Sequence, residues 1–503
     1  MNLARLVEDH VDHFGDYDNT FFEGRWYTSR EARDRVRRVA AGLQELGVAP
    51  GERVAVMLPN CPEVGITYWA TWRIGGAVTP IVFLLPPPEI NRILSNSEAV
   101  IAVTSSELLP AVLAGAEGVS TLKSIVSIDQ AEGTIAFTDL ETSGEAEMIE
   151  REPDDLAALL YTGGTTGASK GVMLSHNNLE WTARAAAEAS EVKPEENGVL
   201  ALPLSHSFGL HVSILNVLTP NKGVLLRWFD PAQMLDLIQE HRVLRTAVVP
   251  TMLQMMLPLP LEDWDLSSLE YITCGAAPLP EEILKQWETR VPSSRLLQGY
   301  GLTETSPTVA VQSPSSARDG TRAIGSVGPV VSGVEVRIAS DEGEALPPGE
   351  VGEITVRGPN IMLGYWRNEE ATNSAIRDGW FHTGDVGRVD EPGNLWIVDR
   401  VKDLIIRGGF NVYPVDVEDV VLQHPDVAEA GVVGRRSDTW GEEPVVFVVA
   451  AGGASLDTDD ILKFCEERLA KYKRPVEVLV VDMLPKTPIG KIDKKELRAR
   501  LGS

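Results

Sequence analysis

Cysteine is scarce in this chain, with three residues among 503: Cys61, Cys274 and Cys465. Thiols so far apart in the sequence exclude a disulfide framework, and the absence of a CxxC pair excludes a zinc site of the usual spacing. Unpaired thiols persist in a reducing compartment. We therefore expect a cytoplasmic protein.

Basic residues are also in the minority. The chain has 45 lysines and arginines against 73 aspartates and glutamates, which gives a formal net charge of −28. A surface this negative repels phosphate backbones and anionic lipids, so we expect no nucleic-acid partner. A polyanionic ligand would have to be held by local basic side chains or by backbone N–H groups.

Long hydrophobic runs are absent too. The most apolar stretch, residues 75–88 (GGAVTPIVFLLPPP), is too short to cross a bilayer and is interrupted by proline. Residues 1–16 (MNLARLVEDHVDHFGD) lack the basic start and apolar core of a signal peptide. We therefore expect no integral membrane segment.

The remaining composition is that of a globular protein, with 43% apolar and 23% charged residues. A chain of this length predicts about three structural units. Helical and strand-like segments alternate, with strands expected at residues 156–162, 245–250 and 271–275 and a helix near 231–242. This alternation predicts an α/β fold with helices packed on mixed or parallel sheets.

The chain is divided by two changes in its composition and in its pattern of apolar residues. From about residue 325 to 400, glycine and proline are frequent and strand-turn-strand patterns replace helical periodicity, which predicts a small antiparallel β subdomain. Residues 401–503 then form a compact α/β pattern of about the size of a separate domain. We expect an N-terminal domain at 1–400 and a C-terminal domain at 401–503.

The most informative segment is YTGGTTGASKGVMLSH, residues 161–176. Its glycines allow the backbone to turn sharply beside an anion, its hydroxyls can donate hydrogen bonds, and Lys170 adds a positive charge. It is not a Walker A loop, because Lys170 lies between serine and glycine. The segment predicts a phosphate cradle, with a flexible surface loop as the plainer alternative.

Four further motifs follow in order: CGAAP at 274–278, QGYGLTETS at 298–306, WFHTGD at 380–385 with Asp399-Arg400 after it, and a tail containing PIGK at 488–491. Each has an ordinary structural explanation when taken alone, such as tight packing, a capped turn, a surface ion pair or the start of a polar helix. The second of them contains Glu304, whose carboxylate suits a hard cation that bridges phosphates.

In this order the motifs resemble those of the adenylate-forming superfamily, which includes acyl-CoA synthetases, firefly-type luciferases and the adenylation domains of peptide synthetases. The pattern YTSGTTGxPKG differs here at Gly163, which replaces serine, and at Ser169, which replaces proline. The resemblance implies a large adenylation domain, a small mobile C-terminal domain with a hinge at Lys402, and the use of ATP, Mg²⁺ and coenzyme A.

The resemblance also implies roles for individual residues. Lys491 would be the catalytic lysine, Thr303 would bind the α-phosphate and Glu304 would hold the metal. His206 would stand beside the substrate carboxylate. The implied ATP and AMP contacts are Thr162, Gly163, Gly164, Thr165, Thr166, Gly167, Lys170, Gly275, Ala276, Ala277, Tyr300, Thr303, Asp385 and Arg400.

The segment LPLSHSFGLH, residues 202–211, resembles the substrate pocket of acyl-CoA synthetases. Amino-acid-activating relatives carry an aspartate where this chain has Ser207, and a buried ammonium without a partner is costly. We therefore expect an apolar carboxylic acid, with medium or long fatty, aryl and alicyclic acids left open. The implied acyl pocket consists of Ser207, Phe208, Met252 and Gly301.

Thioester formation is implied by residues of the C-terminal part. Gly408 and Gly409 would leave a narrow channel for pantetheine, Trp440 would stack on the CoA adenine, and Lys473 and Arg474 would contact its phosphates. Three alternatives stay open: transfer to a carrier protein, a luciferase-like oxidase and a nucleotide-binding protein without catalysis. The expected partners are a small carboxylic acid and CoA, and the chain is expected to be a monomer or a homodimer.

Overall fold

A computed structural model describes residues 2–141, 144–162, 169–340, 342–408, 410–437, 439–452, 456–487 and 491–502. Five residues of the predicted phosphate loop (Gly163, Gly164, Thr165, Thr166 and Gly167) and Gly409 of the predicted pantetheine channel lie outside these ranges. Every helix within the described ranges is too short or too polar to span a bilayer.

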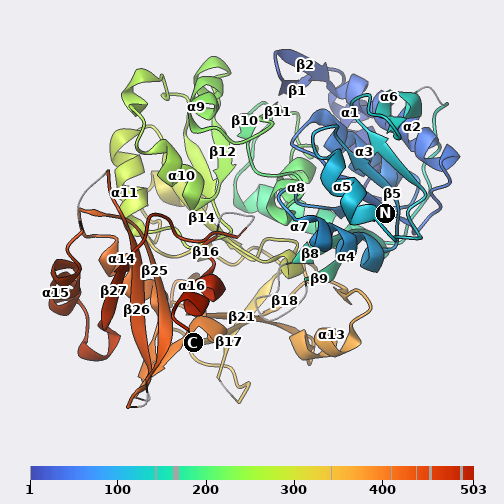
Figure 1. The fold of residues 1–503 in the computed structure, drawn as a ribbon. Helices are drawn as coiled ribbons and strands as arrows, with labels where there is room; N and C mark the ends of the chain where they lie inside the picture. The colour runs from blue at the N-terminus through green and yellow to red at the C-terminus, as the bar shows by residue number, and fades with distance from the viewer. Residues whose placement is uncertain are drawn as a thin grey trace.

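The first subdomain is built on a sheet in the order β19-β9-β8-β4-β3-β5-β6-β7, with helices around it (Figure 1). Strand β5 is buried along its whole length, which explains its unbroken apolar sequence AVIAVT. The strands are β3 (Arg53–Met57), β4 (Ala77–Pro80), β5 (Ala99–Thr104), β6 (Ser124–Ser127), β7 (Ile135–Ala136), β8 (Leu156–Thr162), β9 (Lys170–Ser175) and β19 (Gly364–Tyr365), and the helices are α1 (Arg5–Phe14), α2 (Ser29–Glu45), α3 (Pro62–Arg73), α4 (Pro87–Ser97), α5 (Leu109–Ala116) and α6 (Phe137–Leu140).

The second subdomain has a sheet in the order β15-β14-β13-β12-β10-β11-β1-β2, and β10 to β14 run parallel. The carboxyl ends of its parallel strands therefore lie at one edge, where α/β proteins commonly bind ligands. Its elements are β1 (Asp18–Phe22), β2 (Arg25–Thr28), β10 (Asn197–Leu200), β11 (Lys222–Leu225), β12 (Arg245–Val248), β13 (Tyr271–Cys274), β14 (Arg295–Tyr300), β15 (Ala310–Val311), α7 (His176–Ala189), α8 (Ser207–Leu215), α9 (Pro231–Glu240), α10 (Pro250–Met256), α11 (Glu281–Arg290), α12 (Pro314–Arg318) and the 3₁₀ turns η1 (Leu261–Asp263) and η2 (Thr303–Thr305).

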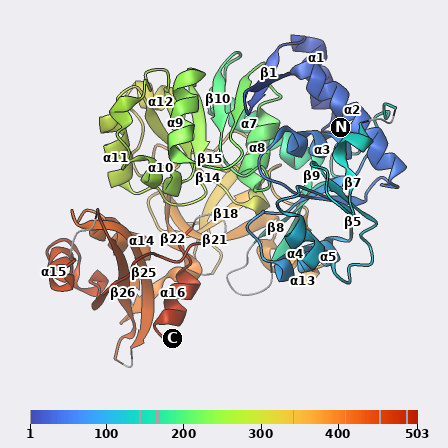
Figure 2. The ribbon, with the colours of Figure 1, turned by 45° about the horizontal axis from the view of Figure 1, so that its top comes forward.

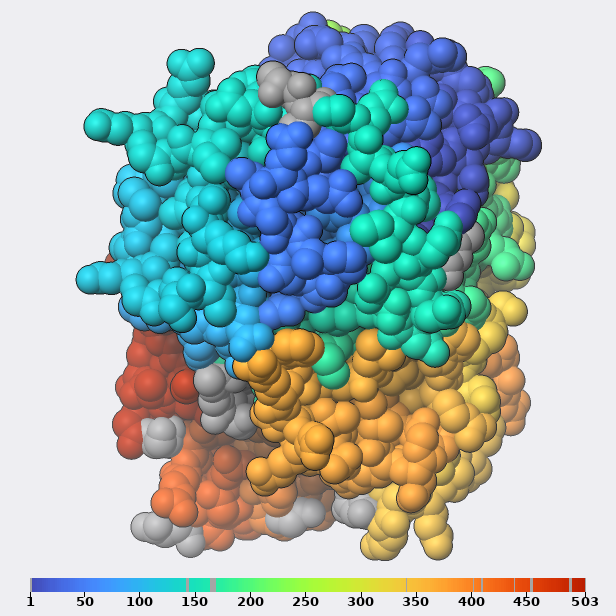
Figure 3. Space-filling view, turned by 90° about the vertical axis from the view of Figure 1, so that its right-hand side faces the viewer, coloured from blue at the N-terminus to red at the C-terminus, as the bar shows by residue number. Residues whose placement is uncertain are grey.

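The β-rich segment forms an antiparallel sheet in the order β16-β22-β21-β18-β17. In the face seen in Figure 3, its residues lie below the first subdomain. The elements are β16 (Gly328–Pro329), β17 (Glu335–Ala339), β18 (Gly352–Arg357), β20 (Ile376–Arg377), β21 (Trp380–Val389), β22 (Asn394–Arg400) and α13 (Glu369–Ala375). Strand β22 ends at Arg400 and leads directly into the 3₁₀ turn η3 (Val401–Asp403).

The C-terminal part has a sheet and hydrophobic clusters of its own (Figure 2). Val432, Val446 and Ile461 are fully buried there and pack only with residues from 405 onwards among those described. This is the pattern of a separate domain. Its elements are β23 (Ile405–Arg407), β24 (Phe410–Val412), β25 (Val427–Ser437), β26 (Gly441–Ala450), β27 (Glu477–Val480), α14 (Pro414–Val421), α15 (Thr458–Arg468), η4 (Lys471–Lys473) and α16 (Lys494–Arg500).

Candidate active site

The predicted phosphate loop connects two antiparallel strands. Thr162 at the end of β8 and Lys170 at the start of β9 are paired across the hairpin. Helix α7 begins only at His176, after the whole of β9. A phosphate at this loop would therefore be bound by backbone N–H groups, hydroxyls and Lys170, without the positive end of a helix behind it.

Strand β19 brings Tyr365 beside this hairpin. Tyr365 pairs with Val172 of β9, and the Lys170 ammonium lies 4.8 Å from the centre of the Tyr365 ring. The Tyr365 hydroxyl donates a hydrogen bond to Oε1 of Glu304, at 3.0 Å. Tyr365 thus links the lysine of the loop motif to the acidic residue of the later motif, although the two lie far apart in the sequence.

Glu304 is the acidic side chain that meets Tyr365 in this cluster. Burial raises the pKa of its carboxyl above the usual range, although Arg400 acts in the opposite direction. Among the described residues no group of three or more His, Cys, Asp or Glu side chains could hold a metal ion. A cation at Glu304 would therefore take its other oxygens from phosphate and water, which is the coordination that Mg²⁺ commonly uses. The residues present fit magnesium brought in with a nucleotide.

A second cluster joins Tyr300, Asp385 and Arg400. Asp385 and Arg400 are cross-strand neighbours in β21 and β22, and the Arg400 Nε lies 2.9 Å from Asp385 Oδ1. The Tyr300 hydroxyl donates to Asp385 Oδ2 at 2.6 Å. Burial and the Asp385 charge together hold the pKa of Tyr300 well above its usual range. An ionised carboxylate has about four acceptor positions, so Asp385 can also receive the hydroxyls of a ribose.

The implied nucleotide contacts Gly275, Ala276 and Ala277 follow the end of β13. Gly275 packs closely against Gly299 and Phe208. An added Cβ there would lie 3.3 Å from the Gly299 carbonyl oxygen and 3.5 Å from the Phe208 ring. Ala276 has φ of +67°, which is uncommon for a residue with a side chain. Ala277 follows it and is half-buried. Small residues here keep a narrow space open at the carboxyl edge of the sheet.

The residues predicted to meet the substrate carboxylate lie at the start of α8. The Thr303 hydroxyl donates to the Ser207 hydroxyl at 3.2 Å, which joins this helix to η2. His206 caps α8 by accepting a hydrogen bond from the Phe208 N–H through Nδ1. Burial and the nearby Lys491 lower the pKa of His206 to about 4, so its ring is neutral at physiological pH.

Lys491 reaches this site from the C-terminal domain. Its segment is held by two hydrogen bonds between Lys491 and Thr487, one from the Thr487 N–H at 2.7 Å and one from the Lys491 N–H at 3.2 Å. Burial and the Arg400 charge lower the pKa of Lys491 to about 8, while Asp385 and Glu304 favour the charged form. The ammonium is therefore close to the predicted ribose, metal and carboxylate residues at once.

This lowered pKa predicts a pH dependence. If Lys491 has the catalytic role that the resemblance implies, kcat/KM for adenylate formation should be level near neutrality and should fall as the pH rises through about 8, where the ammonium loses its charge. His206 would charge only near pH 4 and should produce no change between pH 5 and 7. The measurement is pyrophosphate release across pH 5.5–10. Lys491→Arg, which keeps its charge in alkali, should lose the alkaline decline, and a decline of unchanged position would contradict this origin.

The AMP-binding enzyme family matches residues 7–366, and the AMP-binding enzyme C-terminal domain matches residues 416–491. The chain belongs to the AMP-binding enzyme family. It falls in the acyl-CoA synthetase branch of the adenylate-forming superfamily, which confirms the resemblance found in the motifs.

Relatives of this AMP-binding enzyme include a feruloyl-CoA synthase of an Amycolatopsis species, 38% identical over 95% of both chains. An indoleacetate–CoA ligase of Aromatoleum aromaticum is 36% identical over 99% of this chain and 98% of the relative. Among solved structures, ATP-bound MatB from Rhodopseudomonas palustris has a TM-score of 0.90 at 34% identity, with 99% of both chains covered. The anthranilate CoA ligase AuaEII with anthranoyl-AMP has a TM-score of 0.94 at 27% identity, covering 100% of this chain and 97% of that chain.

In this AMP-binding enzyme Gly408 and Trp440, two of the residues predicted to bind CoA, lie next to each other in the C-terminal part. The Gly408 N–H donates to the Trp440 carbonyl at 2.7 Å, and an added Cβ at Gly408 would lie 2.9 Å from the Trp440 ring. Trp440 is half exposed, and Phe410 nearby in the chain is 60% exposed and stacks on Tyr472. Exposed aromatic rings beside a glycine turn can receive a flat adenine or a narrow thiol arm.

The cations predicted to bind the CoA phosphates already have partners. Lys473 forms an ion pair with Asp416, and Arg474 with Glu466. CoA phosphates would have to compete with these carboxylates. Lys402, the predicted hinge residue, lies within η3, where burial and the adjacent Arg400 lower the pKa of its ammonium to about 8.

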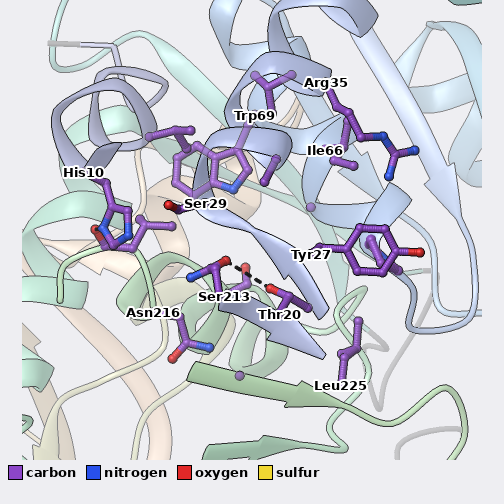
Figure 4. Close-up of a pocket in the computed structure, with 18 of the residues that line it drawn as sticks. His10, Thr20, Tyr27, Ser29, Arg35, Ile66, Trp69, Ser213, Asn216 and Leu225 are labelled. Atoms are coloured by element: carbon purple, nitrogen blue, oxygen red, sulfur yellow. Dashed lines mark hydrogen bonds between the residues drawn. The ribbon is translucent and has the colours of Figure 1, made fainter. Parts of the chain in front are cut away.

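A cavity of about 150 Å³ lies elsewhere in the N-terminal domain. It is lined by residues of α1, β1, β2, α2, α3, β11 and the later part of α8, with Tyr27, Trp69 and Asn216 among its walls (Figure 4). Among the described residues that line it, none belongs to the predicted acyl pocket. Met252 of that predicted pocket is 6% exposed and packs in the main core.

Tyr365 is the site residue that sequence reasoning missed. It lies in the segment LGYW, outside every motif used above, and no local pattern connects it with Glu304 or Lys170. Its role follows from the pairing of β19 with β9, which depends on tertiary structure. A search for aromatic residues in short strand-like segments between the motifs could have identified Tyr365 as a candidate.

Proposed function

We propose that this AMP-binding enzyme converts an aryl carboxylic acid to its CoA thioester through an acyl-adenylate. The observation that carries the proposal is that the buried Lys491 ammonium interacts electrostatically with Arg400, Asp385 and Glu304, because this unites a cation from one domain with the predicted nucleotide residues of the other. Positive charge at this point would stabilise the negative charge that develops between a carboxylate and an α-phosphate.

The first half-reaction follows from these positions. An oxygen of the substrate carboxylate attacks the α-phosphorus of ATP, the bond to the bridging oxygen of the β-phosphate breaks, and pyrophosphate leaves. Lys491 and Thr303 hold the reacting oxygens, and Asp385 holds the ribose. Magnesium, held by Glu304 and phosphate oxygens, would supply further neutralisation of charge. Neutral His206 adds no charge beside the substrate carboxylate.

The second half-reaction transfers the acyl group to a thiol. The CoA sulfur attacks the acyl carbonyl, the bond to AMP breaks, and the thiol proton passes to solvent. We propose that the C-terminal domain turns about Lys402 between the two steps, so that Lys491 withdraws and the surface formed by Gly408, Phe410 and Trp440 approaches. The half-exposed Trp440 beside a glycine turn supports a thiol carried by an adenine nucleotide.

An aryl substrate is favoured over a fatty or alicyclic one. Relatives that cover 95% or more of this chain are named for feruloyl and indoleacetate substrates. The start of α8 agrees with an apolar acid, because Ser207 offers no carboxylate to pair with an amino group and its hydroxyl accepts a hydrogen bond from that of Thr303.

The test is a panel of acids with ATP and CoA, with AMP and acyl-CoA measured by mass spectrometry. We expect kcat/KM for 4-coumarate, ferulate or indoleacetate to exceed that for octanoate, palmitate and cyclohexanecarboxylate by about tenfold or more, as expected when an apolar pocket fits one shape. Parallel reactions without CoA should release pyrophosphate and accumulate acyl-AMP. A preference for fatty acids would overturn the substrate class, and failure to activate any acid would overturn the reaction.

A further inference from the structure

Asp399 is the last acidic residue before Lys402, the predicted hinge. Its side chain accepts a hydrogen bond from a residue on the far side of the hinge. Asp399 is 6% exposed, and its Oδ1 accepts a hydrogen bond from the Arg400 N–H at 2.7 Å. Oδ2 accepts one from the Val415 N–H at 3.2 Å. Val415 belongs to α14, which lies in the C-terminal domain. A buried side chain of one domain is thus satisfied by the backbone of the other.

Lys494 supplies the positive charge at this junction. Its ammonium lies 2.9 Å from Oε1 of Glu418 in α14, and both side chains are largely buried, with 16% and 14% exposed. Glu418 also accepts a hydrogen bond from the Val432 N–H at 2.8 Å, which fixes it to β25. Lys494 is close enough to Asp399 for the two charges to attract each other. Asp399 and Lys494 are therefore both held at α14, Asp399 by the Val415 N–H and Lys494 by Glu418, whose own charge disfavours the charge on Asp399.

The position of Lys494 in the chain gives this contact its significance. It begins α16, three residues after Lys491. Asp493 caps the helix by accepting hydrogen bonds from the Lys495 and Glu496 N–H groups, so the direction of the chain between Lys491 and α16 is set locally. An interaction that fixes the start of α16 near Asp399 therefore also fixes the position of Lys491 in the site.

We propose that Asp399, Lys494 and Glu418 form an interdomain clasp that keeps the C-terminal domain in the adenylate-forming arrangement, with Lys494 as a positioning residue for Lys491. The inference rests on the proposed two-step function. Asp399 precedes Lys402, whereas its partners Val415 and Lys494 follow it. Rotation about Lys402 would separate Asp399 from both, breaking the hydrogen bond from Val415 and weakening the attraction to Lys494, and this favours the adenylate-forming arrangement.

The test compares Lys494→Met with Lys495→Met, which removes an exposed charge from the next residue of the same helix. Adenylate formation is measured as pyrophosphate release without CoA, and thioester formation is measured from supplied acyl-AMP. For Lys494→Met we expect adenylate formation to fall about tenfold, as for loss of a charged hydrogen-bonded pair, while thioester formation is unchanged or faster. Lys495→Met should match the unmodified enzyme in both. Equal losses in both half-reactions, or no loss in either, would overturn the clasp.

Asp399→Asn is the second variant, because it keeps the shape of the side chain and removes its charge. It should shift the ratio of the two half-reactions in the same direction. A readout that needs no activity is the distance between spin labels at Glu281→Cys in α11 and Asp459→Cys in α15, and the three native cysteines are buried. Both clasp variants should broaden this distance distribution in the free enzyme. An unchanged distribution would overturn the clasp, whereas an enzyme that activates no acid would overturn only the proposed function.

Discussion

Replacing Lys491 with alanine is expected to slow acyl-adenylate formation by about two to three orders of magnitude. The side chain is the cation that the C-terminal domain places beside Arg400, Asp385 and Glu304. Removing one preorganised group that stabilises transition-state charge costs about a hundredfold to a thousandfold in kcat. The measurement is pyrophosphate release with ATP and the best acid of the panel, without CoA.

The same variant should leave the second half-reaction nearly intact. Thioester formation from supplied acyl-AMP does not need Lys491 if the domain has turned, so its rate should stay within about twofold of the unmodified enzyme. Lys495→Met, a change of an exposed lysine nearby, is the matched control and should behave normally in both steps. Unchanged pyrophosphate release by Lys491→Ala would remove the basis of the catalytic assignment.

Gly301→Ala should have a comparably large effect through sterics alone. An added Cβ would lie 1.6 Å from the Pro307 carbonyl oxygen and 2.3 Å from its carbon, so the backbone must move. Overpacking lowers the free energy of unfolding by about 1–3 kcal/mol, and by more where the added atom meets backbone. We therefore expect the melting temperature to fall by several degrees. Displacing Tyr300 and Glu304 by about 1 Å should lower the adenylation rate about a hundredfold.

Gly299 provides the control for this change. It lies two residues earlier, in β14, and an added Cβ there would meet its nearest neighbour, a methyl group of Val311, at an ordinary 3.6 Å. Gly299→Ala should therefore keep a melting temperature close to that of the unmodified enzyme and more than half of its rate. If Gly301→Ala behaved equally well, the close approach of Pro307 to this turn would be wrong.

Several secondary-structure predictions are confirmed. Strand β8 occupies residues 156–162 as expected, and β13 and α9 fall within their predicted ranges. Strand β12 stops at Val248, short of the predicted 250, because Pro250 begins α10. Proline lacks the N–H that a strand ladder needs and suits the first turn of a helix. Local propensity therefore decides these elements, and their ends depend on single residues.

The contacts of the candidate site were less accessible to prediction. The motifs indicate Glu304 and Lys170, but the residue between them, Tyr365, reaches them through β19, a strand that is assigned to two residues only. Such a strand leaves almost no periodic pattern. Asp399 was predicted only as the neighbour of Arg400, and its bond to Val415 spans the junction of two domains.

The sequence by itself determined the type of chemistry: the glycine-rich loop, the threonine-glutamate pair, the aspartate for ribose and the lysine of the tail appear in the order of one enzyme superfamily. Only the tertiary structure decided that the loop joins two antiparallel strands, that Tyr365 connects Lys170 to Glu304, and that Asp399 meets the domain bearing Lys491. The physical reason is that residue type and local periodicity are written along the chain, whereas contacts between distant residues depend on the order in which strands join a sheet and on how two domains pack.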